Sequence, residues 1–190
     1  MLATAIELMQ KGATPSVSDV AEAAEVSRAT AYRYFTSQAA LVQAVVDEAL
    51  GPILNWSTDE KDVAARLDSL LISSLPRIGE FEATFRAALA LALQHWGRER
   101  AGTLGDETPL RRGHRVALLE KALAPLREQL SEARFRDLIC GLSLVFGVEA
   151  FVVLKDICGL DAAAAERVML RTASALLREA TAKTTTTIRE

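Results

Sequence analysis

The sequence predicts an all-α protein of about nine helices, and three observations support that prediction. Half of the 190 residues are apolar, and Leu and Ala dominate them, whereas aromatic residues make up only 5%. Only 5 Pro and 10 Gly interrupt the chain, which favours packed helices over strands. Apolar residues recur at three- and four-residue spacing, and no strand-like alternation persists for more than a few residues.

Local start and stop signals divide the first fifty residues into four short helices. Gly12 is expected to end the first helix, and Ser16 to cap the second. Ser27 caps the third helix, and Ser37 starts the fourth. The helices expected here are 2–11, 17–24, 28–35 and 38–50.

Longer helices follow a boundary or kink at Gly51-Pro52. Pro76 is expected to end the first of them. Gly159 closes the fourth, and Asp161 caps the last. The helices expected here are 60–75, 80–98, 110–123, 131–157 and 161–182.

Composition also bounds the class of protein. Cys140 and Cys158 lie in apolar surroundings without metal-ligand spacing, which predicts buried free thiols in a cytoplasmic protein. No signal peptide is visible. The most apolar stretch, 138–154, contains Ser143 and Glu149, so we expect a core helix there and no membrane span.

Catalytic motifs are not found in the sequence. The two histidines, His95 and His114, lie on different segments without metal-ligand spacing. No nucleophile motif, phosphate loop or dinucleotide fingerprint occurs. We therefore expect neither an enzyme nor a bound metal or cofactor.

The segment 17–35 has the pattern of a helix-turn-helix. Two short helices that cross steeply need a small residue at the crossing, which Ala21 supplies. The turn position that usually holds Gly is occupied by Glu25, which we expect to be left-handed at a cost of about 1 kcal/mol. The surrounding positions of the motif are all apolar, at Val20, Ala24, Val26, Ala31 and Phe35.

The outward face of the second helix of this motif suits the major groove of DNA. Arginine can donate two hydrogen bonds to a guanine edge, while Thr and Tyr hydroxyls reach phosphates or bases. Charge argues the other way, because residues 1–50 hold three basic and six acidic side chains, a net charge of −3. An ordinary helical hairpin with snorkelling side chains is the alternative. The face consists of Arg28, Ala29, Thr30, Tyr32, Arg33 and Tyr34.

Three runs of residues resemble the DNA-binding domain of the tetracycline-repressor (TetR) family: 16–21 (SVSDVA), 26–35 (VSRATAYRYF) and 37–41 (SQAAL). The match covers roughly residues 2–50, and the remainder is similar to the family only in helix count and lengths. Gln38 stands where the family commonly has Lys. Family members usually carry a basic arm before the first helix; here the chain begins inside that helix, so either an arm has been lost or the natural start lies upstream.

This resemblance implies a transcriptional regulator, specifically a repressor that an effector releases from palindromic operator DNA. By resemblance, Ser16 and Ser18 meet phosphates, and the second helix of the motif supplies both base and backbone contacts. A helix-turn-helix domain is expected at 1–50 and a ligand-binding and dimerisation domain at 51–190. The expected DNA-binding residues are Ser16, Ser18, Ser27, Arg28, Ala29, Thr30, Tyr32, Arg33, Tyr34 and Gln38.

The resemblance implies a homodimer through the last two helices, of which one is apolar almost all round and the other is amphipathic. A two-fold dimer also doubles the contacts on a palindrome. The alternative is a monomer in which these helices pack only on each other.

A small-molecule effector site is expected among the preceding helices, as an apolar cavity with a few polar groups. Glu149 needs a partner inside its apolar helix: a ligand, Arg115, or the same residue across a dimer. The candidate residues, each also compatible with an ordinary core position, are Phe85, Leu89, His95, Trp96, Arg115, Leu118, Cys140, Phe146 and Glu149.

A second function fits the acidic balance and the missing arm. The chain is then a ligand- or protein-binding helical module whose helix-turn-helix has lost its affinity for DNA.

Overall fold

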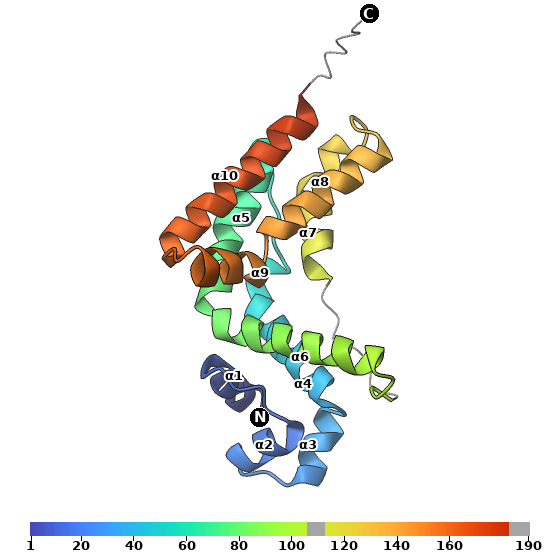
Figure 1. Ribbon diagram of the computed structural model, residues 1–190, viewed down its shortest axis with the longest axis vertical. Helices are drawn as coiled ribbons and strands as arrows, with labels where there is room; N and C mark the ends of the chain where they lie inside the picture. The colour runs from blue at the N-terminus through green and yellow to red at the C-terminus, as the bar shows by residue number, and fades with distance from the viewer. Residues whose placement is uncertain (106–112, 183–190) are drawn as a thin grey trace, which may run out of the picture. The chain divides into compact units, whose positions relative to one another are not determined.

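The computed structural model describes residues 1–105 and 113–182, and within these ranges it contains helices and no strand (Figure 1). The all-α prediction is confirmed. The α-helices are α1 (Leu2–Gln10), α2 (Val17–Ala23), α3 (Arg28–Tyr34), α4 (Gln38–Leu50), α5 (Val63–Glu80), α6 (Glu82–Arg100), α7 (His114–Ala122), α8 (Glu132–Val145), α9 (Val148–Phe151) and α10 (Ala162–Thr181). Short 3₁₀ turns occupy Gly51–Ile53 and Ala124–Leu126, and a π-helical segment occupies Val152–Ile157.

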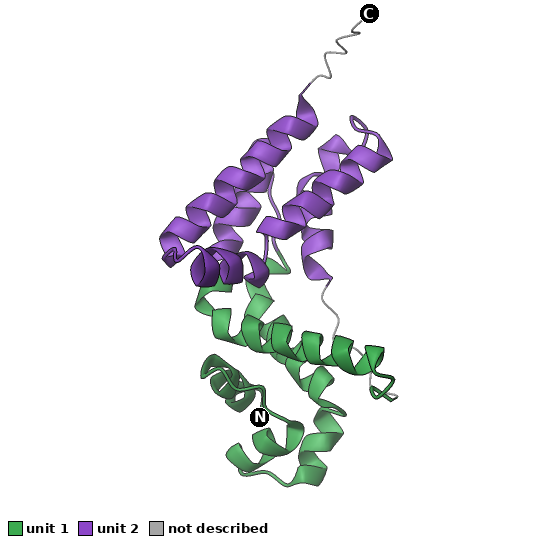
Figure 2. Ribbon diagram, in the orientation of Figure 1, with its two compact units in different colours: residues 1–55, 77–112 green, residues 56–76, 113–190 purple. Residues whose placement is uncertain are grey.

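The chain forms two compact units, shown in Figure 2. Unit 1 contains residues 1–55 and 77–112, and unit 2 contains 56–76 and 113–190. The units alternate along the chain and therefore differ from a contiguous division after residue 50. The division of function between 1–50 and 51–190 stays a prediction.

In unit 1, α6 packs against α1 and α4, and α2 packs against α3 (Figure 1). The three small or branched side chains that α6 adds, Ala87, Ala88 and Leu91, join the same buried cluster as α1 and α4. The other buried members of this cluster are Ala5, Met9, Val17, Val20, Ala21, Ala31, Leu41, Val42 and Val45.

In unit 2, α10 lies along α8, and α7 also packs against α8 (Figure 1). Fully buried side chains come from several helices of this unit, among them Leu67, Leu70 and Leu71 of α5, Leu119 of α7, Leu142 of α8, Phe151 of α9 and Met169 of α10.

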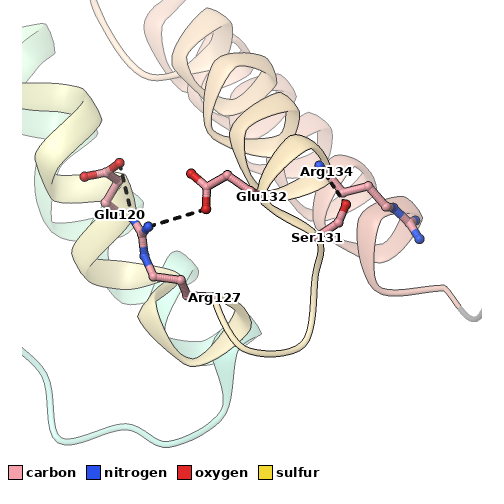
Figure 3. A network of polar contacts seen from close by, with 5 residues as sticks. All are labelled: Glu120, Arg127, Ser131, Glu132 and Arg134. Carbon is pink, nitrogen blue, oxygen red and sulfur yellow. Dashed lines mark hydrogen bonds and ion pairs between the residues drawn. The ribbon is translucent and has the colours of Figure 1, made fainter.

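A polar network connects the end of the α7 segment to α8 (Figure 3). Arg127 donates to Glu120 at 3.4 Å and lies 3.9 Å from Glu132, while its guanidinium also stacks on the ring of Phe135 at 4.7 Å. The side chains of this network are largely exposed, so each ion pair contributes less than about 1 kcal/mol.

Five helices begin with a side-chain cap; four of these caps were predicted, and the fifth, Ser131, was predicted only as the start of a helix. In each, the side chain accepts a hydrogen bond from the backbone amide three residues later, which satisfies one unpaired donor of the first turn. The caps are Ser16, Ser27, Ser37, Ser131 and Asp161. The predicted helix ends at Gly12 and Gly159 also have positive φ, at 86° and 68°.

The predicted continuous helix 131–157 is wrong, because the chain breaks between α8 and α9 with a bend of 53°. Gly147 has φ 154° and ψ 177°, a conformation essentially restricted to Gly. A Cβ at this position would lie 2.6 Å from the guanidinium of Arg115. The guanidinium of an arginine from α7 thus fills the space beside this glycine.

The predicted end at Pro76 is also wrong, since α5 continues to Glu80. A proline inside a helix costs about 3 kcal/mol through its missing N–H and its ring. Leu75 and Ile78, on either side of it, are buried, and Arg77 donates to the carbonyls of Glu48 and Ala49. These contacts offset the cost. The helix expected at 110–123 has its predicted start, residue 110, outside the described residues.

The prediction of buried thiols is wrong as well, because Cys140 and Cys158 are both exposed and not in a disulfide. The apolar stretch 138–154 is not covered on every side: Leu144, one turn after Cys140, is 76% exposed, and Ile157, next to Cys158, is 77% exposed.

Within the described ranges, no single helix is both long and apolar enough to cross a membrane; α8 and the segment Val148–Ile157 meet that condition only as a bent pair.

Candidate nucleic-acid interface

The core between α2 and α3 has the steric form that the sequence predicts. Val20, Ala21 and Ala31 are almost completely buried, and Val26 and Phe35 pack partly against the same cluster. The amide of Val26 donates to the carbonyl of Ala21 at 3.0 Å, which closes the turn. The small side chain at Ala21 therefore lets the two helices approach closely.

The turn between the helices contains Glu25 at φ 55°, the left-handed conformation expected for it. It is the one non-glycine residue with positive φ in the part of the chain that the structure describes. A residue with a Cβ in this conformation carries strain of about 1 kcal/mol.

The first turn of α2 is fixed by a capping box. The amide of Ser16 donates to Oδ2 of Asp19 at 2.8 Å, and the amide of Asp19 donates to Oγ of Ser16 at 3.2 Å. The bond from the Ser16 backbone lowers the pKa of Asp19 most, followed by the bond to the Ser16 side chain and by the charge of Arg28. The carboxylate therefore stays ionised and holds the start of α2 in place.

The surface of α3 is open on most of its circumference, because Ala31 is its one buried residue. Arg28, Ala29 and Arg33 are exposed, and Tyr32 and Tyr34 are 46% and 64% exposed. The guanidinium of Arg33 lies 5.8 Å from the ring centroid of Tyr34. Two guanidinium groups and two phenols thus stand on one short helix, a set of donors suited to phosphates and guanine edges.

The serines at the start of α2 and α3 are tied to their own helices. Ser27 accepts from the amide of Thr30 at 3.2 Å, and the two hydroxyls lie 2.9 Å apart. Ser16 and Ser18 are half-buried. Because the Ser16 hydroxyl accepts its capping bond, its hydrogen remains available to donate to a phosphate.

Gln38 performs a structural task that the sequence did not indicate. Its Nε2 donates to the carbonyl oxygens of Thr14 at 3.0 Å and Pro15 at 3.1 Å. The amide thereby fastens the loop before α2 to the start of α4. A DNA contact by Gln38 stays a prediction.

Sequence reasoning also missed Arg77, which positions the end of α4. Its Nε and Nη2 donate to the carbonyls of Ala49 and Glu48 at 2.5 and 3.3 Å, and its guanidinium stacks on Phe81 at 4.7 Å. These are last-turn carbonyls of α4, which have no partner inside the helix. No local signal near residue 50 indicates an arginine so far along the chain.

The predicted effector residues fall in both compact units. Phe85, Leu89, His95 and Trp96 lie on α6 in unit 1, where Phe85 and His95 are buried and Trp96 is exposed. The others belong to unit 2: Leu118 and Phe146 are buried, Cys140 is exposed, and Arg115 and Glu149 are partly exposed. An effector site at these residues stays a prediction.

Glu149 has one of the three partners considered for it. Nη2 of Arg115 lies 2.6 Å from Oε2 of Glu149, and Nη1 donates to the carbonyl of Ser143 at 3.0 Å. The carboxylate inside the apolar segment is thus compensated by a charge from α7.

Unit 2 also contains a groove of about 750 Å³ lined by residues of α5 and α10. None of the predicted effector residues lines it. Its walls consist of Asp68, Ile72, Val168, Leu170, Arg171, Thr172, Ser174, Ala175 and Arg178.

The capped, tightly crossed helix pair and the open α3 surface have the form of a helix-turn-helix, a motif found in DNA-binding proteins. Residues 1–45 match the family model of bacterial regulatory proteins of the tetR family. On this match, the N-terminal part of the chain is similar to the DNA-binding region of that family.

A solved structure extends the likeness in fold to nearly the whole chain. The crystal structure of a TetR transcriptional regulator from Rhodococcus sp. RHA1 is similar to this protein with a TM-score of 0.57 and 19% identity. The similarity covers 95% of this chain and 94% of that one. Among curated proteins, none matches.

Proposed function

We propose that this protein is a homodimeric repressor that binds palindromic operator DNA through α3 and leaves it when a small-molecule effector binds. The exposed face of α3 carries the proposal. Of the seven residues in that helix, Ala31 alone is buried, so the arginines and tyrosines have no role in the core of the domain.

The side chains of α3 divide into two groups by chemistry. Arg28 and Arg33 can each donate two bonds to a guanine edge, and Ala29 allows close approach and contact with a thymine methyl. The hydroxyls of Thr30, Tyr32 and Tyr34 hold the phosphate backbone, together with Ser16, Ser18, Ser27 and the backbone amide of Gln38 at the N-terminus of α4.

A dimer is supported by apolar side chains that one chain leaves uncovered in unit 2. Leu144 of α8, Val153 and Ile157 of the π-helical segment, and Val168 of α10 are all exposed. Covering them with a second copy buries apolar surface at about 25 cal/mol per Å². A two-fold axis through the last two helices sets the recognition helices one turn of DNA apart, about 34–36 Å. Sedimentation equilibrium is expected to give twice the chain mass of 20.5 kDa, and a mass of one chain contradicts the dimer.

Release by an effector is a population shift. Operator DNA selects the dimer geometry in which the two α3 helices lie about 34–36 Å apart. An effector bound within residues 51–190 favours a dimer geometry with a different spacing. Linkage then requires DNA and effector to weaken each other's binding by the same factor.

Footprinting of the DNA flanking the protein's own gene, at low and moderate salt, tests the proposal. We expect a palindromic protected site whose affinity falls as salt rises. Arg33→Ala removes one α3 guanidinium, and Arg136→Ala, an exposed arginine of α8 in unit 2, is the matched control. Protection that is lost equally in both variants contradicts a specific role for α3.

The alternative is a helical binding module without DNA affinity. It is favoured by the net charge of −3 over residues 1–50 and by the use of the Gln38 amide inside the protein. The two functions separate in the same footprinting experiment: a folded dimer that protects no site at low salt supports the module.

A further inference from the structure

The break between α8 and α9 is held by a side chain from another helix. In a continuous α-helix the amide of Gly147 would donate to the carbonyl of Ser143, four residues earlier. Here that carbonyl accepts instead from Nη1 of Arg115 at 3.0 Å. The Arg115 guanidinium also fills the space beside Gly147, where a Cβ would lie 2.6–2.7 Å from its Cζ and both Nη atoms.

The same guanidinium holds the far side of the break. Its Nη2 bonds to Oε2 of Glu149 at 2.6 Å, in the first turn of α9. Arg115 thus connects the last turn of α8 to the first turn of α9 and replaces a backbone bond that the helix would otherwise make itself. The two side chains are 25% and 36% exposed.

The sequence across the break is compatible with a straight helix. The segment 138–154 contains no proline. It contains two glycines, Gly141 and Gly147. Gly141 lies inside α8 without breaking it, and a glycine inside a helix is tolerated far better than a proline. The chain resumes as a short turn of α-helix and then as the π-helical segment Val152–Ile157, an irregularity that often marks functional sites.

The bent and straight forms bury different faces. The buried stripe of α8 runs through Phe135, Leu138, Leu142 and Phe146 at three- and four-residue spacing. A straight helix would continue this stripe through Ala150 and Val153. In the bent form Val153 is 47% exposed, while Val148 and Phe151 are buried. A bistable element requires two discrete packings of one segment, of which the bent form is the one observed.

We propose that the α8–α9 junction is a two-state hinge, that Arg115 is the wedge holding it bent, and that α8 and α9 join into one helix when the guanidinium leaves. The exposed Leu144 and Val153 lie on either side of the break, so straightening changes the surface that we assign to the dimer. That last consequence rests on the proposed function; the hinge itself does not.

Amide hydrogen exchange on the full chain, without DNA or effector, tests the hinge. Arg115→Ala is expected to slow exchange at residues 146–150 on the order of tenfold, because backbone hydrogen bonds close over the break. Gly147→Ala should act in the same direction, since its Cβ expels the guanidinium and Ala favours helix. The control is Arg127→Ala, which removes another arginine–glutamate pair of unit 2 and should leave exchange at 146–150 unchanged.

Faster exchange at 146–150 would mean that Arg115 has a different role. If Arg115 merely tethers two packed helices, its loss frays them and exchange at 146–150 becomes faster. Faster or unchanged exchange in both variants overturns the hinge. Loss of the fold in both variants also overturns it, because a hinge with two folded states must survive removal of its wedge. Since no DNA enters the measurement, its outcome is independent of whether the protein is a repressor.

Discussion

Glu25 occupies the turn of the helix-turn-helix at φ 55°, where a residue without a Cβ is strongly preferred. We expect Glu25→Gly to raise the free energy of unfolding by about 0.5–1 kcal/mol, because the strain is removed while some unfolded-chain entropy is gained. The urea midpoint measures this change. Glu25→Gln keeps the Cβ and removes only the charge, so it should stay within about 0.5 kcal/mol of wild type. An equal gain in both variants would assign the effect to charge.

Arg33 lies on the exposed face of α3 and carries the last basic charge of that helix. We expect Arg33→Ala to weaken operator binding by about 1–3 kcal/mol and to relax preference at one base position. Arg33→Lys retains a charge for the phosphates but loses the paired donors, so it should restore part of the affinity without the base preference. Binding to operators mutated one position at a time measures both. Unchanged preference in Arg33→Ala would show that Arg33 does not contact a base.

The conformation of a single residue was predictable from the sequence where it depends on residues nearby in the chain. The left-handed Glu25 follows from the two helices on either side of it. Gln38 was not predictable in the same way, because its partners, the carbonyls of Thr14 and Pro15, reach it only after the domain has folded. The exposure of Cys140 depends likewise on which side of α8 its neighbours cover.

At the scale of secondary-structure elements, the starts of helices were predictable from the sequence. A cap is a hydrogen bond between residues three apart, so the residues that form it are neighbours in the sequence. Ser131 and Asp161 illustrate this, since each accepts a bond from its own first turn. The break at Gly147 was not predictable, because its cause is Arg115 on another helix. The passage of α5 through Pro76 also depends on distant contacts, including the two carbonyls bound by Arg77.

The capping box of α2 makes the stability of this element depend on pH. The pKa of Asp19 in the folded protein lies below its usual value, so its ionised form stabilises the fold above the unfolded pKa, near 3.9. That stability is lost as pH falls through the lower, folded pKa. Because Asp19 is exposed, the effect is small. We expect Asp19→Asn to be slightly less stable than wild type at pH 7.

Urea midpoints from pH 7 to pH 2.5 check this expectation. The difference between wild type and Asp19→Asn should shrink steadily below pH 4. Glu22→Gln removes a carboxylate from the same helix without altering the capping box. If the two variants show the same pH dependence, the effect belongs to the net charge of α2 and not to its cap.

At the scale of the whole molecule, the four N-terminal helices do not complete their own core. Residues 1–50 read as a separate domain, because four short helices with good caps end at a Gly-Pro pair. In the structure, Ala87, Ala88 and Leu91 of α6 close the cluster formed by α1 and α4. No sequence pattern links these segments, since the contact spans a long stretch of intervening chain. α6 is therefore part of the structure that holds α3 in position.

Two leucines on α6 test this dependence. Leu91 is 2% exposed and Leu93 is 61% exposed, so they offer the same substitution on one helix with opposite burial. We expect Leu91→Ala to cost about 2–5 kcal/mol of unfolding free energy through lost burial and a residual cavity. Leu93→Ala should change it by less than about 0.5 kcal/mol.

Which helices Leu91→Ala destabilises is as informative as the free energy that it costs. If α6 completes the core of the four N-terminal helices, Leu91→Ala should raise hydrogen exchange in α1 and α4 while the segments of unit 2 keep their protection. Operator affinity should then fall, because a destabilised α4 no longer holds the loop before α2, to which Gln38 is hydrogen-bonded. Increased exchange confined to α6 itself would mean that α1 and α4 hold together without it. The helix-turn-helix would then be independent of the rest of the chain, and any signal from the larger domain would need another route to α3.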